Sequence, residues 1–205
     1  MKLEIVTLKV HVSRLIMSVI LYAAFINSVM ADGMKDKLVI DGRSNTDVTS
    51  NLGTKWQLVT DNVMGGVSQG QLTLDSYKGR QCLRMRGDVT TENNGGFVQI
   101  ALSLSEQGGF DASDYTGVEI EVAGNNELYN IHFRTSELWF PWQSYRYSFT
   151  ATSDWQTYRI PFSVLEKYKT FHKFSQDEIK RIGLVAIGRD FQADLCLAAI
   201  AFYHD

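Results

Sequence analysis

The most chemically suggestive part of the chain is a short stretch around residues 130–146, where aromatic and polar side chains gather. Exposed aromatic rings can stack on sugar rings or anchor a protein partner, and an arginine can hold a carboxylate through two parallel hydrogen bonds. Two tryptophans in a polar loop would be costly to leave as bare apolar surface. We therefore expect a binding site here, unless the loop folds back and its rings cap one end of the core. The candidate binding residues are Asn130, His132, Arg134, Trp139, Trp142, Tyr145 and Arg146.

The sequence offers only generic groups for catalysis. Glu119 and Glu121 are two residues apart on one expected strand face, and a glycosidase pair needs about 5–9 Å between its carboxyl groups. Alternating glutamates on an outward face are usually solvated surface, however. Ser68 lacks the Gly-x-Ser-x-Gly elbow of a hydrolase, and the neighbouring glycines match neither phosphate-loop pattern. We therefore expect no enzymatic activity.

The elements that carry these residues have the pattern of β-strands. About ten short stretches alternate apolar and polar residues, and turn residues such as those at 93–96 and 124–126 separate them. Short helical turns are expected near 162–168 and 175–180, the second with Ser175 as its cap and Glu178 at the capping-box position. Because no alternation of strands with long helices is present, the pattern predicts an all-β antiparallel sandwich or barrel.

The composition is that of one ordinary globular domain. The 205 residues are 44% hydrophobic and 12% aromatic, which is enough for a substantial core and too apolar for a disordered chain. Lys and Arg number 20 against 23 Asp and Glu, a net charge of −3. This near balance gives no indication of nucleic-acid binding.

The first 31 residues differ in character from the rest. Lys2, Lys9 and Arg14 precede an apolar run at 15–26, and Val-Met-Ala at 29–31 offers a cleavage site. The run has 12 residues and a membrane span needs about 20, so we expect a cleaved secretory signal peptide, with a retained anchor as the alternative. This predicts a secreted or periplasmic domain of residues 32–205. Its net charge would be −5, because three basic residues and one acidic residue are removed, leaving 17 against 22.

Export would place the two cysteines in an oxidising compartment. Cys82 and Cys196 could then form a disulfide. Alternatively, they are two small buried hydrophobic residues that never meet. Both lie in expected strands, and the sequence leaves open whether those strands are neighbours.

Residues 56–70 read as two strands joined by a shaped turn, Trp-Gln-Leu-Val-Thr-Asp-Asn-Val-Met-Gly-Gly-Val-Ser-Gln-Gly. The paired glycines allow backbone angles that are closed to other residues, and the Asp, Asn and Ser side chains are expected to bond their own backbone and hold the turn. The residues that define this turn are Trp56, Asp61, Asn62, Met64, Gly65, Gly66 and Ser68.

Together with segments further along the chain, this turn resembles the signature of the complex I intermediate-associated protein 30 (CIA30) family. The resemblance covers nearly all of residues 32–205. It implies an antiparallel two-sheet jelly-roll sandwich of the galactose-binding-like type and a non-catalytic role. The further matching segments, in chain order, are Gly95–Phe97, Tyr115–Val118, Phe133–Thr135, Trp155–Phe162 and Ile182–Leu184.

The resemblance also suggests what kind of partner to expect. Mitochondrial relatives act as assembly chaperones for respiratory complex I and bind its intermediates transiently. An exported protein would not meet the matrix- or cytoplasm-facing arm of that complex, so we expect a different protein partner in the cell envelope. The alternative is a carbohydrate-binding module that uses Trp139, Trp142 and Tyr145 as a stacking platform.

No cofactor or metal motif is present in the sequence. His132 has no Cys or His at ligand spacing. Related sandwiches often hold a structural Ca²⁺, an ion that prefers oxygen ligands, but no motif marks a site for it here. The aspartates that could serve in kind are Asp41, Asp47, Asp111 and Asp114.

Overall fold

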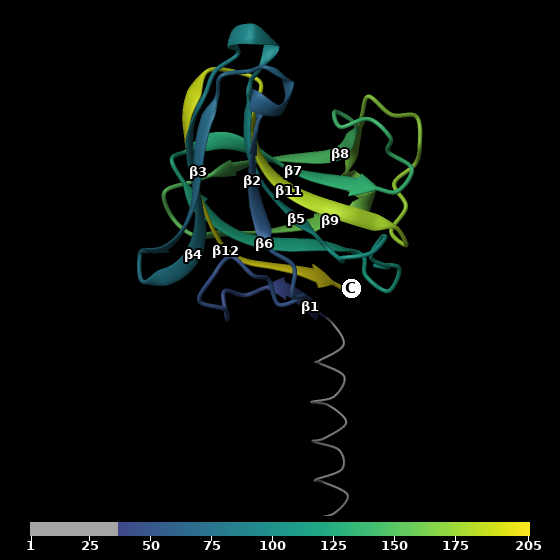
Figure 1. Ribbon diagram of the computed structural model, residues 1–205. Helices are drawn as coiled ribbons and strands as arrows, with labels where there is room; N and C mark the ends of the chain where they lie inside the picture. The colour runs from purple at the N-terminus through teal and green to yellow at the C-terminus, as the bar shows by residue number, and fades with distance from the viewer. Residues whose placement is uncertain (1–36) are drawn as a thin grey trace, which may run out of the picture. The chain divides into compact units, whose positions relative to one another are not determined.

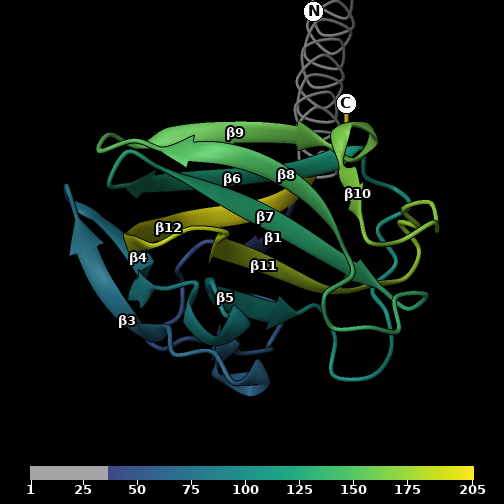
Figure 2. The same cartoon turned by 90° about the horizontal axis from the view of Figure 1, so that it is seen from above.

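Strands dominate the chain and form two antiparallel sheets, seen as two layers in Figures 1 and 2. The computed structural model describes residues 37–205, so the predicted signal peptide at 1–31 lies outside the described residues. Sheet I has the strand order β3 (Gln69–Tyr77), β4 (Arg80–Val89), β12 (Phe191–Tyr203), β6 (Gly117–Gly124) and β9 (Gln156–Pro161), and β1 (Lys37–Asp41) also pairs with β12. Sheet II has the order β10 (Glu166–Tyr168), β8 (Ser144–Ala151), β7 (Glu127–Thr135), β11 (Ile179–Ile187), β5 (Phe97–Ser103) and β2 (Trp56–Thr60). The predicted two-sheet antiparallel sandwich is confirmed.

Period-two alternation along the strands places the core between the sheets. Ile131 on β7 and Leu184 on β11 meet Ile120 on β6 and Leu195 on β12 in one core cluster, and all four are fully buried. Burying a side chain of this size contributes about 1.5–3 kcal/mol. The intervening residues of the same strands point outward, and this gives each sheet an outer face.

The helical content is limited to three single 3-10 turns in residues 37–205, η1 (Asp61–Met64), η2 (Glu92–Asn94) and η3 (Phe162–Val164). The turn expected at 162–168 ends early, because Glu166–Tyr168 pair with the otherwise open edge of β8. The turn expected at 175–180 is not helical; its residues lead into β11, where pairing with two strands outweighs the local capping signal. Within the described residues, no helix has both the length and the apolar character to cross a membrane.

The buried carboxylate of Asp61 holds the turn between β2 and β3. It accepts hydrogen bonds from Ser68 N–H (3.0 Å) and Ser68 Oγ–H (2.5 Å), and from the N–H groups of Gly96 (2.5 Å) and Phe97 (3.2 Å). Burial alone would raise the pKa of Asp61, but these hydrogen bonds lower it below its usual value. A Cβ atom on Gly66 would collide with this carboxylate, which explains the glycine.

Other residues of this turn are fixed in the same way. Asn62 Nδ2 donates to a carbonyl oxygen across the turn at 3.0 Å, and Gly65 adopts a φ of +90° that favours glycine. The indole N–H of Trp56 donates to Asp41 Oδ2 at 2.7 Å beneath the sheet edge. Met64 is exposed. The turn is therefore a rigid structural element that joins β2, β3 and the start of β5.

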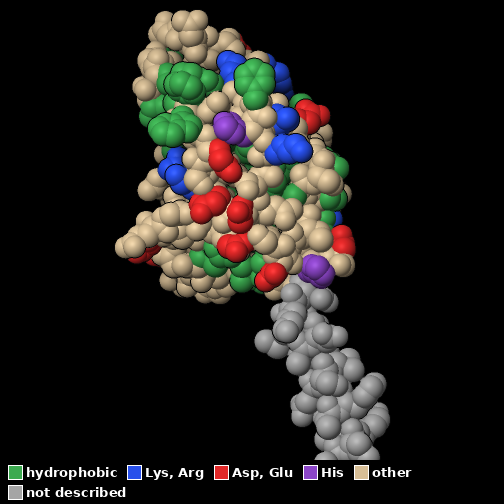
Figure 3. Space-filling model, turned by 90° about the vertical axis from the view of Figure 1, so that its right-hand side faces the viewer, with side chains coloured by type: hydrophobic (Ala, Val, Ile, Leu, Met, Phe, Trp, Pro, Cys, Tyr) green, Lys and Arg blue, Asp and Glu red, His purple; other side chains and the backbone are tan. Residues whose placement is uncertain are grey.

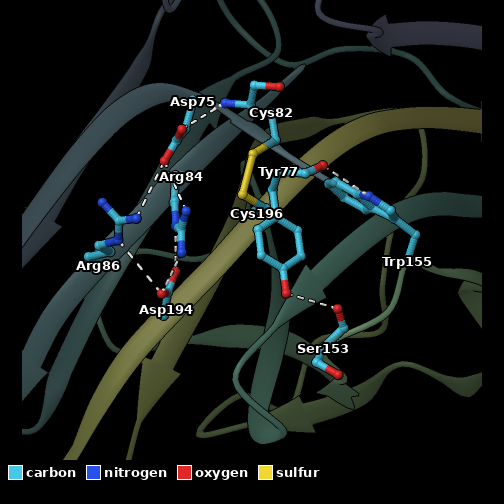
Figure 4. The surroundings of a disulfide bond; sticks show 10 residues. Asp75, Tyr77, Cys82, Arg84, Arg86, Ser153, Trp155, Asp194 and Cys196 are labelled. Carbon is cyan, nitrogen blue, oxygen red and sulfur yellow. Dashed lines mark hydrogen bonds and ion pairs between the residues drawn. A yellow bond between two sulfur atoms is a disulfide. The ribbon is translucent and has the colours of Figure 1, made fainter. Parts of the chain in front are cut away.

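Cys82 on β4 and Cys196 on β12 are disulfide-bonded, with their Cα atoms 5.4 Å apart (Figure 4). Their strands are neighbours in sheet I, which settles the question that the sequence left open. Beside the disulfide, Arg84 makes a bidentate ion pair with Asp194 (2.7 and 2.8 Å) and a further hydrogen bond with Asp75 (2.9 Å). The outer face of sheet I is thus covered by paired charges.

Candidate binding site

Three aromatic side chains stand out from the loop of residues 138–143 between β7 and β8, which we call the aromatic loop. Trp139 is 87% exposed, Phe140 52% and Trp142 47%. The rings of Phe140 and Trp142 stack with their centroids 4.9 Å apart. Figure 3 views the end of the domain where such loops gather and shows exposed hydrophobic side chains beside Lys and Arg side chains. A group of exposed aromatic side chains of this kind often marks an interaction site.

Arg134, at the end of β7, holds the aromatic loop in shape. Its Nη1 lies within hydrogen-bond distance of three backbone carbonyl oxygens of this loop, and its Nη2 donates to a fourth. Burial, and next the nearby charge of Arg181, lower the pKa of Arg134. Arg134 therefore acts as an internal support for the exposed rings, whereas the sequence suggested that it would grip a ligand carboxylate. The acceptors are Leu138 O (3.1 Å), Phe140 O (2.8 Å), Pro141 O (2.7 Å) and Gln143 O (2.9 Å).

Gln143 provides a second brace that the sequence analysis missed. Its Oε1 accepts the Phe140 N–H at 3.0 Å, and its Nε2 donates to Lys169 O at 3.1 Å. The aromatic loop is thereby tied to the loop that follows β10, where the Phe171 side chain is fully exposed. Nothing in the local sequence pattern signals such a bridge, because it joins segments 26 residues apart.

Tyr145 does not belong to this exposed surface. It lies on the core-facing side of β8 and is fully buried, with its hydroxyl donating to Lys173 O at 2.9 Å and its ring packed edge-on against Phe174. Burial raises the pKa of its hydroxyl. The expected stacking platform of Trp139, Trp142 and Tyr145 is therefore not formed. The rings exposed at this end are those of the aromatic loop and Phe171.

The other predicted site residues do share one surface, the outer face of sheet II. Asn130, His132 and Arg134 alternate with core residues along β7, and Arg146 lies directly opposite His132 in the register of β8. The Arg146 guanidinium stacks on the Tyr168 ring, 3.3 Å from its centroid. Asn130 Oδ1 accepts a hydrogen bond from the hydroxyl of Ser148 at 2.9 Å.

His132 is the most unusual group on this face. Its Nε2 is shielded from solvent and has no hydrogen-bond partner among residues 37–205. Burial, and next the charge of Arg146, lower the pKa of His132 to about 3. The imidazole is therefore neutral at physiological pH and keeps hydrogen-bonding capacity that no described residue uses.

The candidate carboxylates lie away from the aromatic loop. Glu119 and Glu121 are on β6 in sheet I, and Glu121 forms an ion pair with Arg80. Asp41 accepts hydrogen bonds from Trp56 and Arg43. In the described part of the chain, no three His, Cys, Asp or Glu side chains are grouped so that they could hold a metal ion. Of the remaining aspartates considered for Ca²⁺, Asp47 lies in the loop between β1 and β2, and Asp111 and Asp114 lie in the loop between β5 and β6.

Comparison with known proteins identifies the family. Residues 46–197 match the model of the family called Complex I intermediate-associated protein 30 (CIA30). The chain belongs to the CIA30 family. No curated protein sequence matches it. The Asp61 turn and the sandwich described above are therefore features of a CIA30 domain.

Solved structures with the same fold include carbohydrate-binding modules from Clostridium thermocellum. The family 11 module of the cellulosomal cellulase Lic26A-Cel5E is similar with a TM-score of 0.64 and 15% identity over 82% of this chain and 95% of that one. The family 30 module of the cellulase Cel9D-Cel44B is similar with a TM-score of 0.59 and 18% identity, over 82% and 98%. The agarase AgWH50C also contains the fold, with a TM-score of 0.57 and 10% identity, but this chain covers only 25% of it. At these identities the likeness establishes the fold alone.

Proposed function

We propose that this CIA30 domain is a non-catalytic binding protein that captures a protein partner through its aromatic loop. The observation that carries the proposal is the exposure of Trp139, Phe140 and Trp142 on a loop braced by Arg134. Aromatic residues dominate the energetic centres of protein interfaces. A braced loop loses little conformational freedom on binding, which favours affinity.

The arrangement of the rings favours a protein over a neutral sugar at this loop. Phe140 and Trp142 cover one face of each other, and the buried Tyr145 contributes no stacking surface. What remains is a broad apolar patch, extended by the exposed Phe171 on the adjoining loop. A patch of this kind suits an apolar segment of a protein that is exposed before its assembly is complete.

The cellular setting is also part of the proposal. The family takes its name from association with complex I intermediates. The expected signal peptide at residues 1–31 would carry this domain to the periplasm or outside the cell, away from the matrix- or cytoplasm-facing arm of complex I. We therefore place the partner in the cell envelope and assign the domain an assembly or chaperone role there.

Site-specific cross-linking tests this proposal. A photoreactive phenylalanine analogue replaces Phe140, and in a matched control it replaces Leu74, which is exposed on β3 of sheet I. Cross-links are formed in cells and the products identified by mass spectrometry. The proposal expects one envelope protein to be linked from position 140 but not from position 74, and the purified pair to lose affinity on Trp139→Ala/Trp142→Ala. If both positions link the same mixture, or if the double variant binds as well as the wild type, the aromatic loop is not the interface. Binding of the wild type alone to a neutral glycan array would favour the carbohydrate alternative.

A further inference from the structure

The arginines of residues 37–205 fall into two groups, those that form ion pairs with carboxylates and those that do not. Six of the nine arginines in residues 37–205 form ion pairs with carboxylates. None of these six lies on a strand of sheet II. The three arginines on sheet II, Arg134, Arg146 and Arg181, form no ion pair with any described residue. The six paired arginines are Arg43, Arg80, Arg84, Arg86, Arg159 and Arg189.

The three unpaired arginines lie close together on the outer face of sheet II. Arg146 on β8 is opposite His132 on β7, and Arg134, two residues further along β7, is opposite Arg181 on β11. Neighbouring strands are about 4.8 Å apart, so the three arginines occupy neighbouring positions in the register of sheet II. β5, β8 and β11 contain no Asp or Glu. Glu166 on the edge strand β10 lies directly opposite Arg146 in the register, but the two form no ion pair within residues 37–205.

Like charges on neighbouring strands repel each other. Sheet I shows how this domain removes such repulsion: Arg84 and Arg86 share Asp75 and Asp194 (Figure 4). On sheet II, Arg134 uses its donors on the aromatic loop, whereas Arg181 has no hydrogen bond to a described residue. In a protein with a net charge of −3, this concentration of unpaired positive charge suits an anionic ligand.

The same face also carries uncharged polar side chains, the imidazole of His132 and the amides of Asn130 and Gln99. The His132 Nε2 is buried without a hydrogen-bond partner in residues 37–205, and the partly exposed side-chain amides of Asn130 and Gln99 lie on the same face. Gly183, opposite His132 on β11, leaves the centre of the face without a side chain. A Cβ atom there would lie 3.3 Å from Gln99 Oε1. Side-chain amides around a small central residue suit a ligand with many hydroxyl groups.

We propose that the outer face of sheet II binds an acidic oligosaccharide, a hydroxyl-rich ligand whose carboxylates pair with Arg146 and Arg181. Stacking on Tyr168 and a hydrogen bond from Arg146 Nε to Ser144 Oγ (2.9 Å) orient the Arg146 guanidinium in advance. Its two terminal nitrogens can then grip one carboxylate through parallel hydrogen bonds. The partly exposed amides of Asn130 and Gln99 face the sugar hydroxyls. This site is separate from the aromatic loop and does not depend on the protein-partner proposal.

Isothermal titration calorimetry tests the site with a defined probe. The full-length purified protein is titrated with tetragalacturonate, with its fully methyl-esterified form as the neutral counterpart, and with inorganic phosphate as a plain anion. We expect binding of the acid form, weakened by salt, and no comparable binding of the ester or of phosphate. Equal binding of acid and ester, tighter binding of phosphate, or no binding of the acid at millimolar concentration would each overturn the proposal.

Variants with equal charge change locate the site. Arg181→Gln and Arg146→Gln are each expected to weaken tetragalacturonate binding about tenfold, because a charge-assisted hydrogen bond is lost. Arg159→Gln, which removes the same charge from sheet I, is expected to leave binding within about twofold. Equal losses in all three would indicate nonspecific attraction and refute the site. Trp139→Ala/Trp142→Ala should retain saccharide binding. The experiments therefore test saccharide binding on sheet II separately from protein binding at the aromatic loop.

Discussion

Replacing Arg134 with lysine should loosen the aromatic loop while keeping its positive charge. The guanidinium contacts three carbonyl oxygens through Nη1 and Leu138 O through Nη2, and the single ammonium nitrogen of lysine cannot occupy both of these positions. If two of the four hydrogen bonds are lost at about 1 kcal/mol each, the loop loses about 2 kcal/mol of support. Because each 1.4 kcal/mol is a factor of ten, the open form of the loop becomes roughly thirtyfold more populated.

Native-state hydrogen exchange measured by NMR would detect this change residue by residue. The amides of Leu138, Phe140 and Gln143 are bonded within the loop region and should exchange roughly thirtyfold faster in Arg134→Lys. The amide of Ile131 on the same strand should be unaffected. Unchanged loop exchange would refute the role of Arg134 as a brace. Equal acceleration of the Ile131 amide would show that the substitution destabilises the whole sandwich and that the local argument is wrong.

Three further predictions concern stability. Asp61→Asn should lower the free energy of unfolding by about 2–3 kcal/mol at pH 7 in urea titrations, because four hydrogen-bond donors lose a carboxylate acceptor. The pKa of Asp61 is lowered in the folded state, so this loss of stability should become smaller as the pH falls below about 4. A loss that stays constant with pH would contradict the prediction. His132 has a folded-state pKa of about 3. As the pH falls, the histidine is protonated in the unfolded state before it is protonated in the folded state. The free energy of unfolding of the wild type should therefore decrease relative to that of His132→Gln from pH 6.5 down to about 3. Parallel pH profiles of the two proteins would show that His132 is not buried. Reducing the Cys82–Cys196 disulfide, whose residues are 114 apart in sequence, should lower stability by about 2–5 kcal/mol, and the double alanine variant should show no effect of reductant.

The fold was accessible from the sequence because its signals are local. Val98, Ile100 and Leu102 alternate with outward residues on β5, and the strand and its buried face follow from that period alone. Strand partners were less accessible, because pairing depends on segments far apart in the chain. The adjacency of β4 and β12, which decides the disulfide, is one such case.

The candidate site was only partly accessible, for a physical reason. Exposure of Trp139 and Trp142 could be inferred from the polar loop that carries them. The burial of Tyr145 follows from the alternation of β8, because Tyr145, Tyr147 and Phe149 form its apolar face, and the hypothesis of a stacking platform gave this signal too little weight. The bracing role of Arg134 could not be predicted, because its hydrogen-bond acceptors are backbone carbonyl oxygens. Every residue has such an oxygen, so no sequence pattern indicates which ones an arginine will contact.

The arginines on the two sheets differ in their partners, and this contrast supports the binding face proposed on sheet II. On sheet I, Arg84 is neutralised twice, by Asp75 and Asp194, so that surface has little left to offer a ligand. On sheet II, one arginine supports exposed aromatic rings, and Arg146 and Arg181 form no ion pair within residues 37–205. Stability alone would favour pairing on both faces, because unpaired like charges repel. The outer face of sheet II lacks these ion pairs and lies beside the aromatic loop, and both features support the proposal that this side of the domain binds other molecules.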